Sequence, residues 1–250
     1  MSAVLEAMHL AKFFGGLQAV HDVSFEVAAG EMLAMIGPNG AGKTTCFNLL
    51  NGQLVPDAGR VKLDGRDVVG LSPRAMWRLG VGRTFQITAT FPSLTVRENI
   101  QLTLASHHRR LWNGWAPASE LYCAEADRLL DRIGMREQAE RACAVLAYGD
   151  LKRVEFAIAL AHDPRLLLMD EPTAGMAPKE RVELMALVSS VVRERKIAAL
   201  FTEHDMDVVF AHADRIIVLN RGRLIAAGKP NEVRQDPEVQ QVYLGSGSYH

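Results

Sequence analysis

The stretch LAYGDLKRVEFAIALAHDPRLLLMDEPTAG (residues 146–175) decides the fold of this 250-residue chain. A glycine turn opens an apolar helix, which we expect over residues 152–162 and which ends at an Asp-Pro pair. The run LLLM (residues 166–169) then predicts a strand, because a continuous apolar run is typical of a strand covered on both faces of a parallel sheet. The strand ends at Asp170-Glu171, so the sequence predicts a helix–strand unit that presents two carboxylates at one edge of a sheet.

A second motif, GPNGAGKTT (residues 37–45), matches the phosphate-loop pattern G-x-x-x-x-G-K-[ST] in full. It follows the apolar run of residues 31–36 and precedes a helix, which is the context that the motif requires. Gly40 and Gly42 allow the backbone to curl so that successive N–H groups face one concavity. These groups and the helix N-terminus bind phosphate oxygens.

The side chains of this motif predict the rest of the phosphate site. Lys43 is expected to reach the β- and γ-phosphates, the Thr44 hydroxyl to bind Mg²⁺, and Thr45 to lie near the α-phosphate. Asp170 is expected to hold Mg²⁺ beside the loop. Glu171 projects further, where it could orient and deprotonate the attacking water. The alternative, two acids that merely cap a strand, is weak because a phosphate loop needs an acidic metal partner.

Composition limits the function classes. The chain is 48% hydrophobic and 23% charged, with a formal net charge of −1, so electrostatics favour neither nucleic acid nor an anionic membrane as the main partner. Three cysteines without a CxxC pair indicate neither a disulfide framework nor a zinc site. We see no signal peptide and no run of about 18 apolar residues. We therefore expect a soluble, cytosolic protein, and other chains must form any pore.

Strand signals fade between residues 87 and 142, where we expect a helical insert. Thr95 and Glu98 form a capping-box pattern at a helix start. A helical face is expected at Tyr122, Ala126, Leu129, Leu130 and Ile133. We interpret the stretch HHRR (residues 107–110), with Trp112 and Trp115, as a solvated basic loop and not as a metal or nucleic-acid site.

The rest of the chain has an α/β pattern. Alternation at Val23, Phe25 and Val27 predicts a half-buried antiparallel strand, and residues 61–63 predict a short edge strand. The later elements are expected to be a helix at 178–195, a strand at 197–202, a helix at 205–212, a strand at 215–219 and a hairpin turn at 220–222. Strands flanked by helices imply a mostly parallel sheet with helices on both sides.

Together these motifs resemble the ATP-binding subunits of ATP-binding-cassette (ABC) transporters, over residues 5–244. The resemblance implies an α/β fold with a P-loop NTPase core, a mostly parallel sheet, an N-terminal antiparallel β subdomain and a helical insert. It implies a single domain over residues 1–250, in which 1–86 and 143–250 form the core and 87–142 the helical subdomain. Residues 245–250 are expected to be a disordered tail.

The resemblance also implies roles for particular residues. Phe14 matches the aromatic that stacks on adenine, Gln86 the glutamine that touches Mg²⁺ and links to the permease, and His204 the switch histidine. LAYGD (residues 146–150) occupies the signature position, which binds ATP held by the opposite subunit. The implied nucleotide contacts are Phe14, Gly37, Pro38, Asn39, Gly40, Ala41, Gly42, Lys43, Thr44, Thr45, Ala147 and Gly149; the implied Mg²⁺ ligands are Thr44, Gln86 and Asp170; the implied catalytic residues are Glu171, His204, Gln86 and Lys43.

Three positions depart from the family pattern. The usual signature is LSGGQ, whereas this chain has Ala147 for the serine and Asp150 for the glutamine. Ala177 stands where the family has an aspartate that serves communication across the dimer. Because the lysine, glutamate and histidine of the ATP site are kept, we expect hydrolysis, whereas a regulatory pseudo-ATPase would have lost one of them.

LAYGD, AGM-x-P, GRTFQITATFPSLTVREN and the closing VYLG resemble the ATPase subunits of branched-chain amino acid importers most. This implies two transmembrane permease subunits, a second ABC ATPase as homo- or heterodimer partner and, indirectly, an extracytoplasmic substrate-binding protein. It also implies a peripheral location at the cytoplasmic face of the membrane. A lipopolysaccharide-export-like ATPase is the alternative. A soluble ABC protein acting on DNA or ribosomes is disfavoured by the single cassette without basic excess, and a GTPase by the lack of an N-K-x-D strand end.

Overall fold

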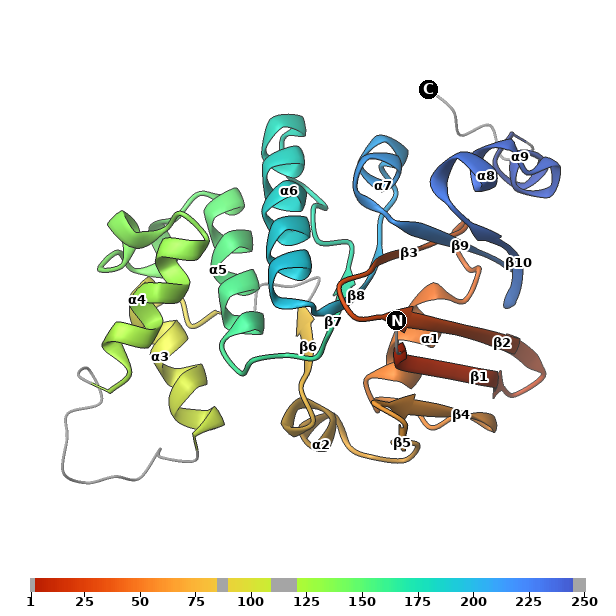
Figure 1. Cartoon of the computed structure of the whole chain (residues 1–250), viewed down its shortest axis with the longest axis horizontal. Coiled ribbons are helices and arrows are strands. Elements are labelled where there is room, and N and C mark those ends of the chain that lie inside the picture. The colour runs from red at the N-terminus through yellow and green to blue at the C-terminus, as the bar shows by residue number, and fades with distance from the viewer. Residues whose placement is uncertain (1–2, 85–89, 109–120, 245–250) are drawn as a thin grey trace.

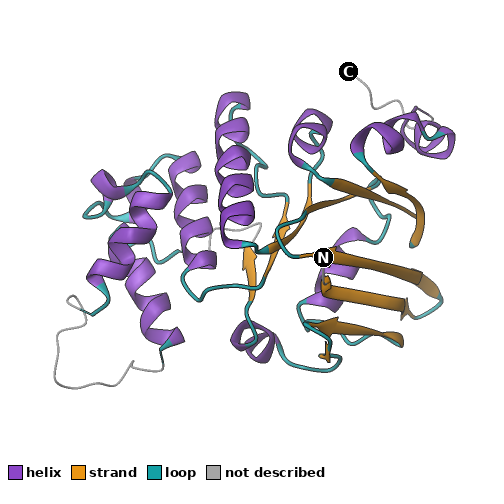
Figure 2. Cartoon of the chain, in the orientation of Figure 1, coloured by secondary structure: helices purple, strands orange, loops and turns teal. Residues whose placement is uncertain are grey.

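A computed structural model describes residues 3–84, 90–108 and 121–244 of the chain. Its centre is a six-stranded sheet in the order β10-β9-β3-β8-β7-β6, and every neighbouring pair is parallel except β10 with β9. The mostly parallel sheet that the sequence predicts is therefore present (Figure 2). The strands are β3 (Met32–Ile36), β6 (Val81–Thr84), β7 (Leu166–Asp170), β8 (Ala198–Thr202), β9 (Arg215–Asn220) and β10 (Arg223–Gly228).

A second, antiparallel sheet has the order β2-β1-β4-β5. It contains β1 (Ala3–Phe14), β2 (Leu17–Ala28), β4 (Ala58–Leu63) and β5 (Arg66–Asp67). The expected edge strand at residues 61–63 is wrong in two respects: β4 begins at Ala58, and it lies between β1 and β5. The edge position belongs to the two-residue β5, which is too short to stand out in the sequence.

Nine α-helices complete the described part of the chain. They are α1 (Lys43–Leu50), α2 (Pro73–Arg78), α3 (Val96–His107), α4 (Cys123–Arg132), α5 (Tyr148–Leu160), α6 (Pro178–Arg195), α7 (Met206–His212), α8 (Pro230–Gln235) and α9 (Pro237–Leu244), with short 3-10 helices at Arg136–Gln138 and Cys143–Val145. Helices α5, α6 and α7 follow one another along one side of the central sheet (Figure 1). Among the described residues, no helix is long and apolar enough to cross a membrane.

The two faces of the central sheet belong to two different cores. Alternate residues of β3 show this, since Met32, Ala34 and Ile36 pack in one core and Leu33 and Met35 in the other. The first core contains α5, α6 and α7, while the second contains α1 and the inner face of the antiparallel sheet. Helices therefore lie on both sides of the sheet, as expected, and the antiparallel sheet shares the second face with α1. Every strand residue of β3, β7 and β8 is buried, as their unbroken apolar runs indicate.

Helix α5 begins at Tyr148, four residues before the expected start at residue 152. The glycine turn of LAYGD is therefore the first turn of the helix, with Ala147 at the N-cap position. The sequence did not indicate this start because Ala147 offers no side-chain cap. The consequence is that the unpaired N–H groups of a helix N-terminus lie within the signature segment.

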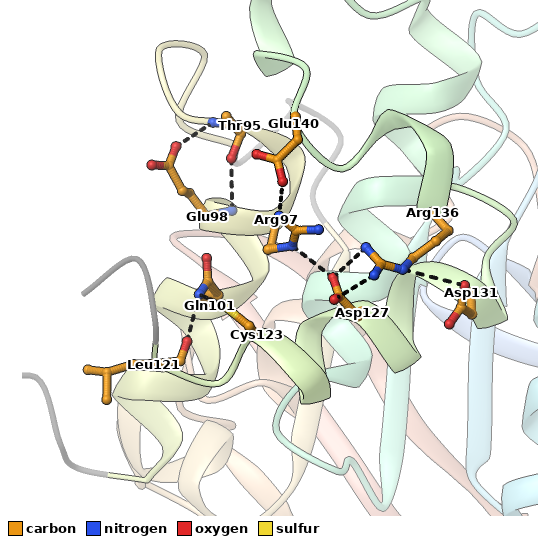
Figure 3. A network of polar contacts seen from close by, with 10 residues as sticks. All are labelled: Thr95, Arg97, Glu98, Gln101, Leu121, Cys123, Asp127, Asp131, Arg136 and Glu140. Atoms are coloured by element: carbon orange, nitrogen blue, oxygen red, sulfur yellow. Dashed lines mark hydrogen bonds and ion pairs between the residues drawn. The ribbon is translucent and has the colours of Figure 1, made fainter. Parts of the chain in front are cut away.

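Helices α3 and α4 lie at the end of the molecule opposite the antiparallel sheet, beside α5 (Figure 1). The capping box at the start of α3 is present, since Thr95 and Glu98 bond each other's backbone N–H groups. Asp127 of α4 accepts hydrogen bonds from Arg97 of α3 and from Arg136, at 2.7 and 2.8 Å (Figure 3). These bonds tie the two helices together, although the proposed boundaries of a helical subdomain at residues 87 and 142 stay a prediction.

Candidate functional site

A pocket of about 470 Å³ lies where the phosphate loop meets the carboxyl edge of the central sheet. This volume is within the range of sites that bind small molecules. The carboxyl ends of β3, β7 and β8 meet there because parallel strands end at the same edge. The pocket is lined by Phe14, Leu17, Gln18, Ala19, Asn39, Gly40, Ala41, Gly42, Lys43, Thr44, Thr45, Asp170, Glu171, His204, Arg221 and Gly222.

The phosphate loop packs too closely against its surroundings for side chains at two of its glycines. A Cβ atom on Gly37 would lie 2.1 Å from the carbonyl oxygen of Leu219, and one on Gly42 would lie 2.5 Å from that of Ala19. Gly42 also has a φ of 103°, a conformation that residues with a Cβ rarely adopt. The loop is thus held between β9 and the start of β2, with its N–H groups and the N-terminus of α1 beside the pocket.

The Lys43 side chain bends back, and its ammonium group bonds the same loop. Its Nζ donates hydrogen bonds to the carbonyl oxygens of Gly37 at 2.6 Å and Pro38 at 3.1 Å. Burial lowers the pKa of Lys43, and the nearby carboxylates of Glu171 and Asp170 act in the opposite direction. The site therefore places one cation between the loop and the two acids, where it can pair with phosphate oxygens.

The two acids stand at the end of β7 and are held by β8 and the loop that follows it. The Thr202 hydroxyl donates to Asp170 Oδ1 at 2.7 Å and accepts from the Glu171 N–H at 3.0 Å. His204 Nε2 lies 2.8 Å from Glu171 Oε1. Because an ionised carboxylate only accepts hydrogen bonds, this contact requires the proton to be on Nε2. The histidine and the glutamate, 33 positions apart in the chain, thus form one hydrogen-bonded pair at the pocket.

The structure brings most of the expected site residues together. Phe14, Thr44, Thr45 and the phosphate-loop residues from Asn39 onward line the pocket, together with Asp170, Glu171 and His204. Phe14 is 47% exposed, so its side chain is accessible for stacking. Gln86 lies outside the described residues, and its expected contact with Mg²⁺ stays a prediction.

The signature segment lies elsewhere. Ala147 and Gly149 are not among the residues that line the pocket. Gly149 lies against the start of α6, since a Cβ there would be 3.0 Å from the Glu180 carboxyl group. A second cavity of about 290 Å³ borders this turn, lined among others by Gly149, Asp150 and Glu180. The expectation that the signature serves the ATP of another subunit stays a prediction.

The sequence analysis missed some residues of the site. Arg221 and Gly222, interpreted only as a hairpin turn, line the pocket because β9 is the parallel neighbour of β3 and ends at the same edge. Burial lowers the pKa of Arg83 in β6, and the nearby Asp170 carboxylate acts in the opposite direction. Thr202 was taken only as the end of a strand. These residues reach the site through the register of parallel strands, and sequence periodicity does not report that register.

The donor set of this pocket fits a magnesium nucleotide. The Thr44 hydroxyl and the Asp170 carboxylate are oxygen ligands, which Mg²⁺ prefers. The loop residues from Asn39 to Thr45 line the pocket, where their main-chain N–H groups can bind phosphate oxygens. An aromatic ring, a phosphate loop, a lysine and an acidic pair thus line a single pocket.

Comparisons with known proteins agree with this geometry. A family model described as "ABC transporter" matches residues 20–174. A second model, described as "Branched-chain amino acid ATP-binding cassette transporter", matches residues 223–249. The chain therefore belongs to the ABC transporter family, and both the expected fold class and the expected ATPase class are confirmed.

Relatives extend this similarity over almost the whole chain. The chain is 40% identical to the high-affinity branched-chain amino acid transport ATP-binding protein BraF of Pseudomonas aeruginosa, over 97% of this chain and 98% of that protein. It is 39% identical to the corresponding protein LivG of Escherichia coli, over 93% of this chain and 94% of that protein. It is 35% identical to the lipopolysaccharide export system ATP-binding protein LptB of Acidithiobacillus ferridurans, over 98% of each.

A solved structure shows the same fold. The ADP conformation of MJ1267, an ATP-binding cassette of an ABC transporter, superposes with a TM-score of 0.87 at 30% sequence identity. The match covers 98% of this chain and 100% of that one. The similarity therefore includes both sheets and the helices beside them, and not the phosphate loop alone.

Proposed function

We propose that this chain is the ATP-hydrolysing subunit of an importer that carries branched-chain amino acids. The observation that carries the proposal is the pocket in which Lys43, Asp170, Glu171 and His204 converge. Two findings support the cargo: the second family model at the C-terminal end of the chain, and the similarity to BraF and LivG. The lipopolysaccharide-export alternative rests on a less similar relative, at 35% identity.

Different residues of the chain have different roles in ATP hydrolysis. The phosphate loop and Lys43 bind the phosphates, and Thr44, Asp170 and Gln86 would hold Mg²⁺, which when bound neutralises phosphate charge. Glu171 accepts a proton from the attacking water. At the same time the water oxygen bonds the γ-phosphorus, and the bond between that phosphorus and the β–γ bridging oxygen breaks. The bond from His204 would orient that carboxylate, and the imidazole would contact the γ-phosphate.

The partners follow from the same proposal. Two transmembrane permease subunits would form the pathway, and a second ABC ATPase, identical or paralogous, would place its ATP against Ala147 and Gly149. A substrate-binding protein outside the cytoplasm would deliver the amino acid. The chain would then lie at the cytoplasmic face of the membrane as a peripheral subunit.

Uptake of labelled leucine tests the cargo. A strain that lacks this chain is complemented either with the wild type or with Glu171→Gln. Loss of uptake that only the wild type restores supports both import and the catalytic glutamate. Leucine, isoleucine and valine uptake that does not depend on the chain would contradict the proposed cargo, and the same strain is then assayed for lipopolysaccharide at the cell surface.

Release of phosphate from ATP tests the enzymatic step separately. The assembly is purified from membranes through an affinity tag on this chain, so that its natural partners are retained. Hydrolysis that requires Mg²⁺ and disappears in Lys43→Met supports the proposed site. Equal hydrolysis by the wild type and Lys43→Met would show that the activity comes from another protein.

A further inference from the structure

The main chain of Glu171 has an unusual conformation that needs an explanation. Its φ is 51°, in the left-handed region that residues with a Cβ rarely occupy. The residue directly follows the last residue of β7, so the chain turns sharply between Asp170 and Glu171. Strained backbone of this kind at an active site persists where neighbouring groups hold it in place.

The Thr202 side chain is one of these neighbouring groups. It lies opposite Asp170 in the parallel register of β7 and β8, and it is completely buried. Its hydroxyl donates to Asp170 Oδ1 at 2.7 Å and accepts from the Glu171 N–H at 3.0 Å. The carbonyl oxygen of Thr202 accepts from the same N–H at 3.2 Å. One hydroxyl thus links the side chain of the first acid to the backbone of the second.

Glu203, the next residue, holds the other side of the turn. Its carboxylate is 6% exposed, and Oε1 accepts from both the N–H and the hydroxyl of Thr173, at 2.9 and 2.6 Å. Its Oε2 accepts from the N–H of His204 at 3.2 Å. The buried carboxylate of Glu203 therefore links Thr173, two positions after Glu171, to His204, whose side chain bonds that of Glu171.

We propose that Thr202 and Glu203 are positioning residues for ATP hydrolysis, which rests on the ATPase function proposed above. Neither is among the residues that line the pocket, so each would act through the residues that do. Thr202 sets the relation between the Asp170 carboxylate and the Glu171 backbone. Glu203 keeps Thr173 and His204 at fixed positions on the far side of the turn. Thr202 is the last residue of β8 and Glu203 follows it. These two consecutive residues therefore hold the segment from Asp170 to Thr173 through the hydrogen bonds described above.

The position of a reacting group strongly affects rate, and a displacement of about 1 Å can cost about 100-fold. Removal of the Thr202 hydroxyl deletes one of the two hydrogen bonds that the Glu171 N–H donates to Thr202, and it deletes the bond to the Asp170 carboxylate. The phosphate loop is not changed. The effect should therefore fall on the turnover number, while ATP binding is kept. A hydroxyl that only satisfied a buried polar group would affect stability and not turnover.

The test compares Thr202→Val, which has nearly the same shape without the hydroxyl, with Thr202→Ser, which keeps the hydroxyl. A matched control is Thr103→Val in α3, where the lost hydroxyl donates to the Asn99 carbonyl oxygen within the helix. For each variant of the membrane-purified assembly we measure kcat, KM for ATP, and the rise in melting temperature on addition of Mg·ATP.

We expect Thr202→Val to lower kcat about 10-fold or more, with KM and the Mg·ATP-induced rise in melting temperature close to wild type. Thr202→Ser and Thr103→Val should stay within about 3-fold of the wild-type kcat. If Thr202→Val does not fold, Glu203→Gln carries the test with the same expected loss of kcat.

Wild-type turnover in Thr202→Val, or in Glu203→Gln where that variant replaces it, overturns the inference, as does an equal loss in Thr202→Val and Thr202→Ser. Absence of turnover in the wild-type assembly would instead contradict the proposed ATPase function. The two failures are therefore distinguishable.

Discussion

His204 Nε2 and Glu171 Oε1 are 2.8 Å apart, so the two side chains proposed to act at the γ-phosphate already form a hydrogen-bonded pair. We expect His204→Ala to lower ATP turnover by about 100-fold, because Glu171 loses its orienting donor and the γ-phosphate a nearby contact. Nucleotide affinity, measured with a fluorescent ATP analogue, should change by less than about 3-fold. The control is His9→Ala, since His9 pairs with Asp22 on the exposed surface. Full turnover in His204→Ala would contradict the role.

Glu171→Gln should separate binding from hydrolysis. The amide keeps the size of the side chain but cannot accept a proton from water, so we expect turnover to fall by at least about 100-fold. ATP should still bind and hold two ATPase subunits together, which size-exclusion chromatography in ATP would detect. Glu194→Gln in α6 is the matched control, because Glu194 forms a surface ion pair with Arg132. Rapid turnover by Glu171→Gln would assign the proton transfer to another group.

Gly37→Ala should damage the phosphate loop through a steric clash. The new methyl group would lie 2.1 Å from the backbone oxygen of Leu219, which cannot move away without disturbing β9. We expect a loss of about 2 kcal/mol or more in unfolding free energy, together with weaker ATP binding. Gly16→Ala is the control, since no atom lies within 4 Å of the added carbon. Urea unfolding of both variants measures the difference, and equal stability would show that the loop adapts.

His162 should make stability depend on pH. Burial, and secondarily the nearby His107, lower the pKa of His162 from 6.5 to about 4. The folded protein therefore keeps the ring neutral, while the unfolded chain binds a proton below pH 6.5. The stabilising contribution is present above pH 6.5 and is lost as the pH falls from 6.5 to about 4.

The ring stacks on Trp77, at 4.9 Å between centroids, so His162→Phe can keep the stack without the titration. Between pH 7 and pH 4.5 the wild type should lose about 2 kcal/mol more unfolding free energy than this variant. Urea unfolding at both pH values measures the two losses. Equal losses would mean that His162 is protonated in the folded state.

Asp127 should stabilise the pairing of α3 with α4. It accepts bonds from Arg97 and Arg136, while the nearby Asp131 has a longer, 3.8 Å contact with Arg136 (Figure 3). We expect Asp127→Asn to cost about 1–2 kcal/mol and to speed amide hydrogen exchange in both helices. Asp131→Asn is the matched control and should cost less than about 0.5 kcal/mol. Similar exchange in the two variants would show that apolar packing alone holds these helices.

The sequence by itself determined the elements that depend on contacts between residues close together in the chain. The capping box at Thr95 and Glu98 was predicted because both residues bond the backbone within one helical turn. The phosphate loop was predicted because its glycines, lysine and threonine act within nine consecutive residues. Helix α6 has the expected bounds, from Pro178 to Arg195, because proline at a first-turn position is a strong start signal.

The tertiary structure alone decided which distant groups meet. Thr202 bonds Asp170 across 32 positions of the chain, and this contact depends on the register of two parallel strands. Periodicity reports whether a strand is buried, but it does not report its neighbour or its register. The interior position of β4 was missed for the same reason. This sequence therefore determined the kind of chemistry and the residues that supply it, while the pairing of strands decided what holds those residues in place.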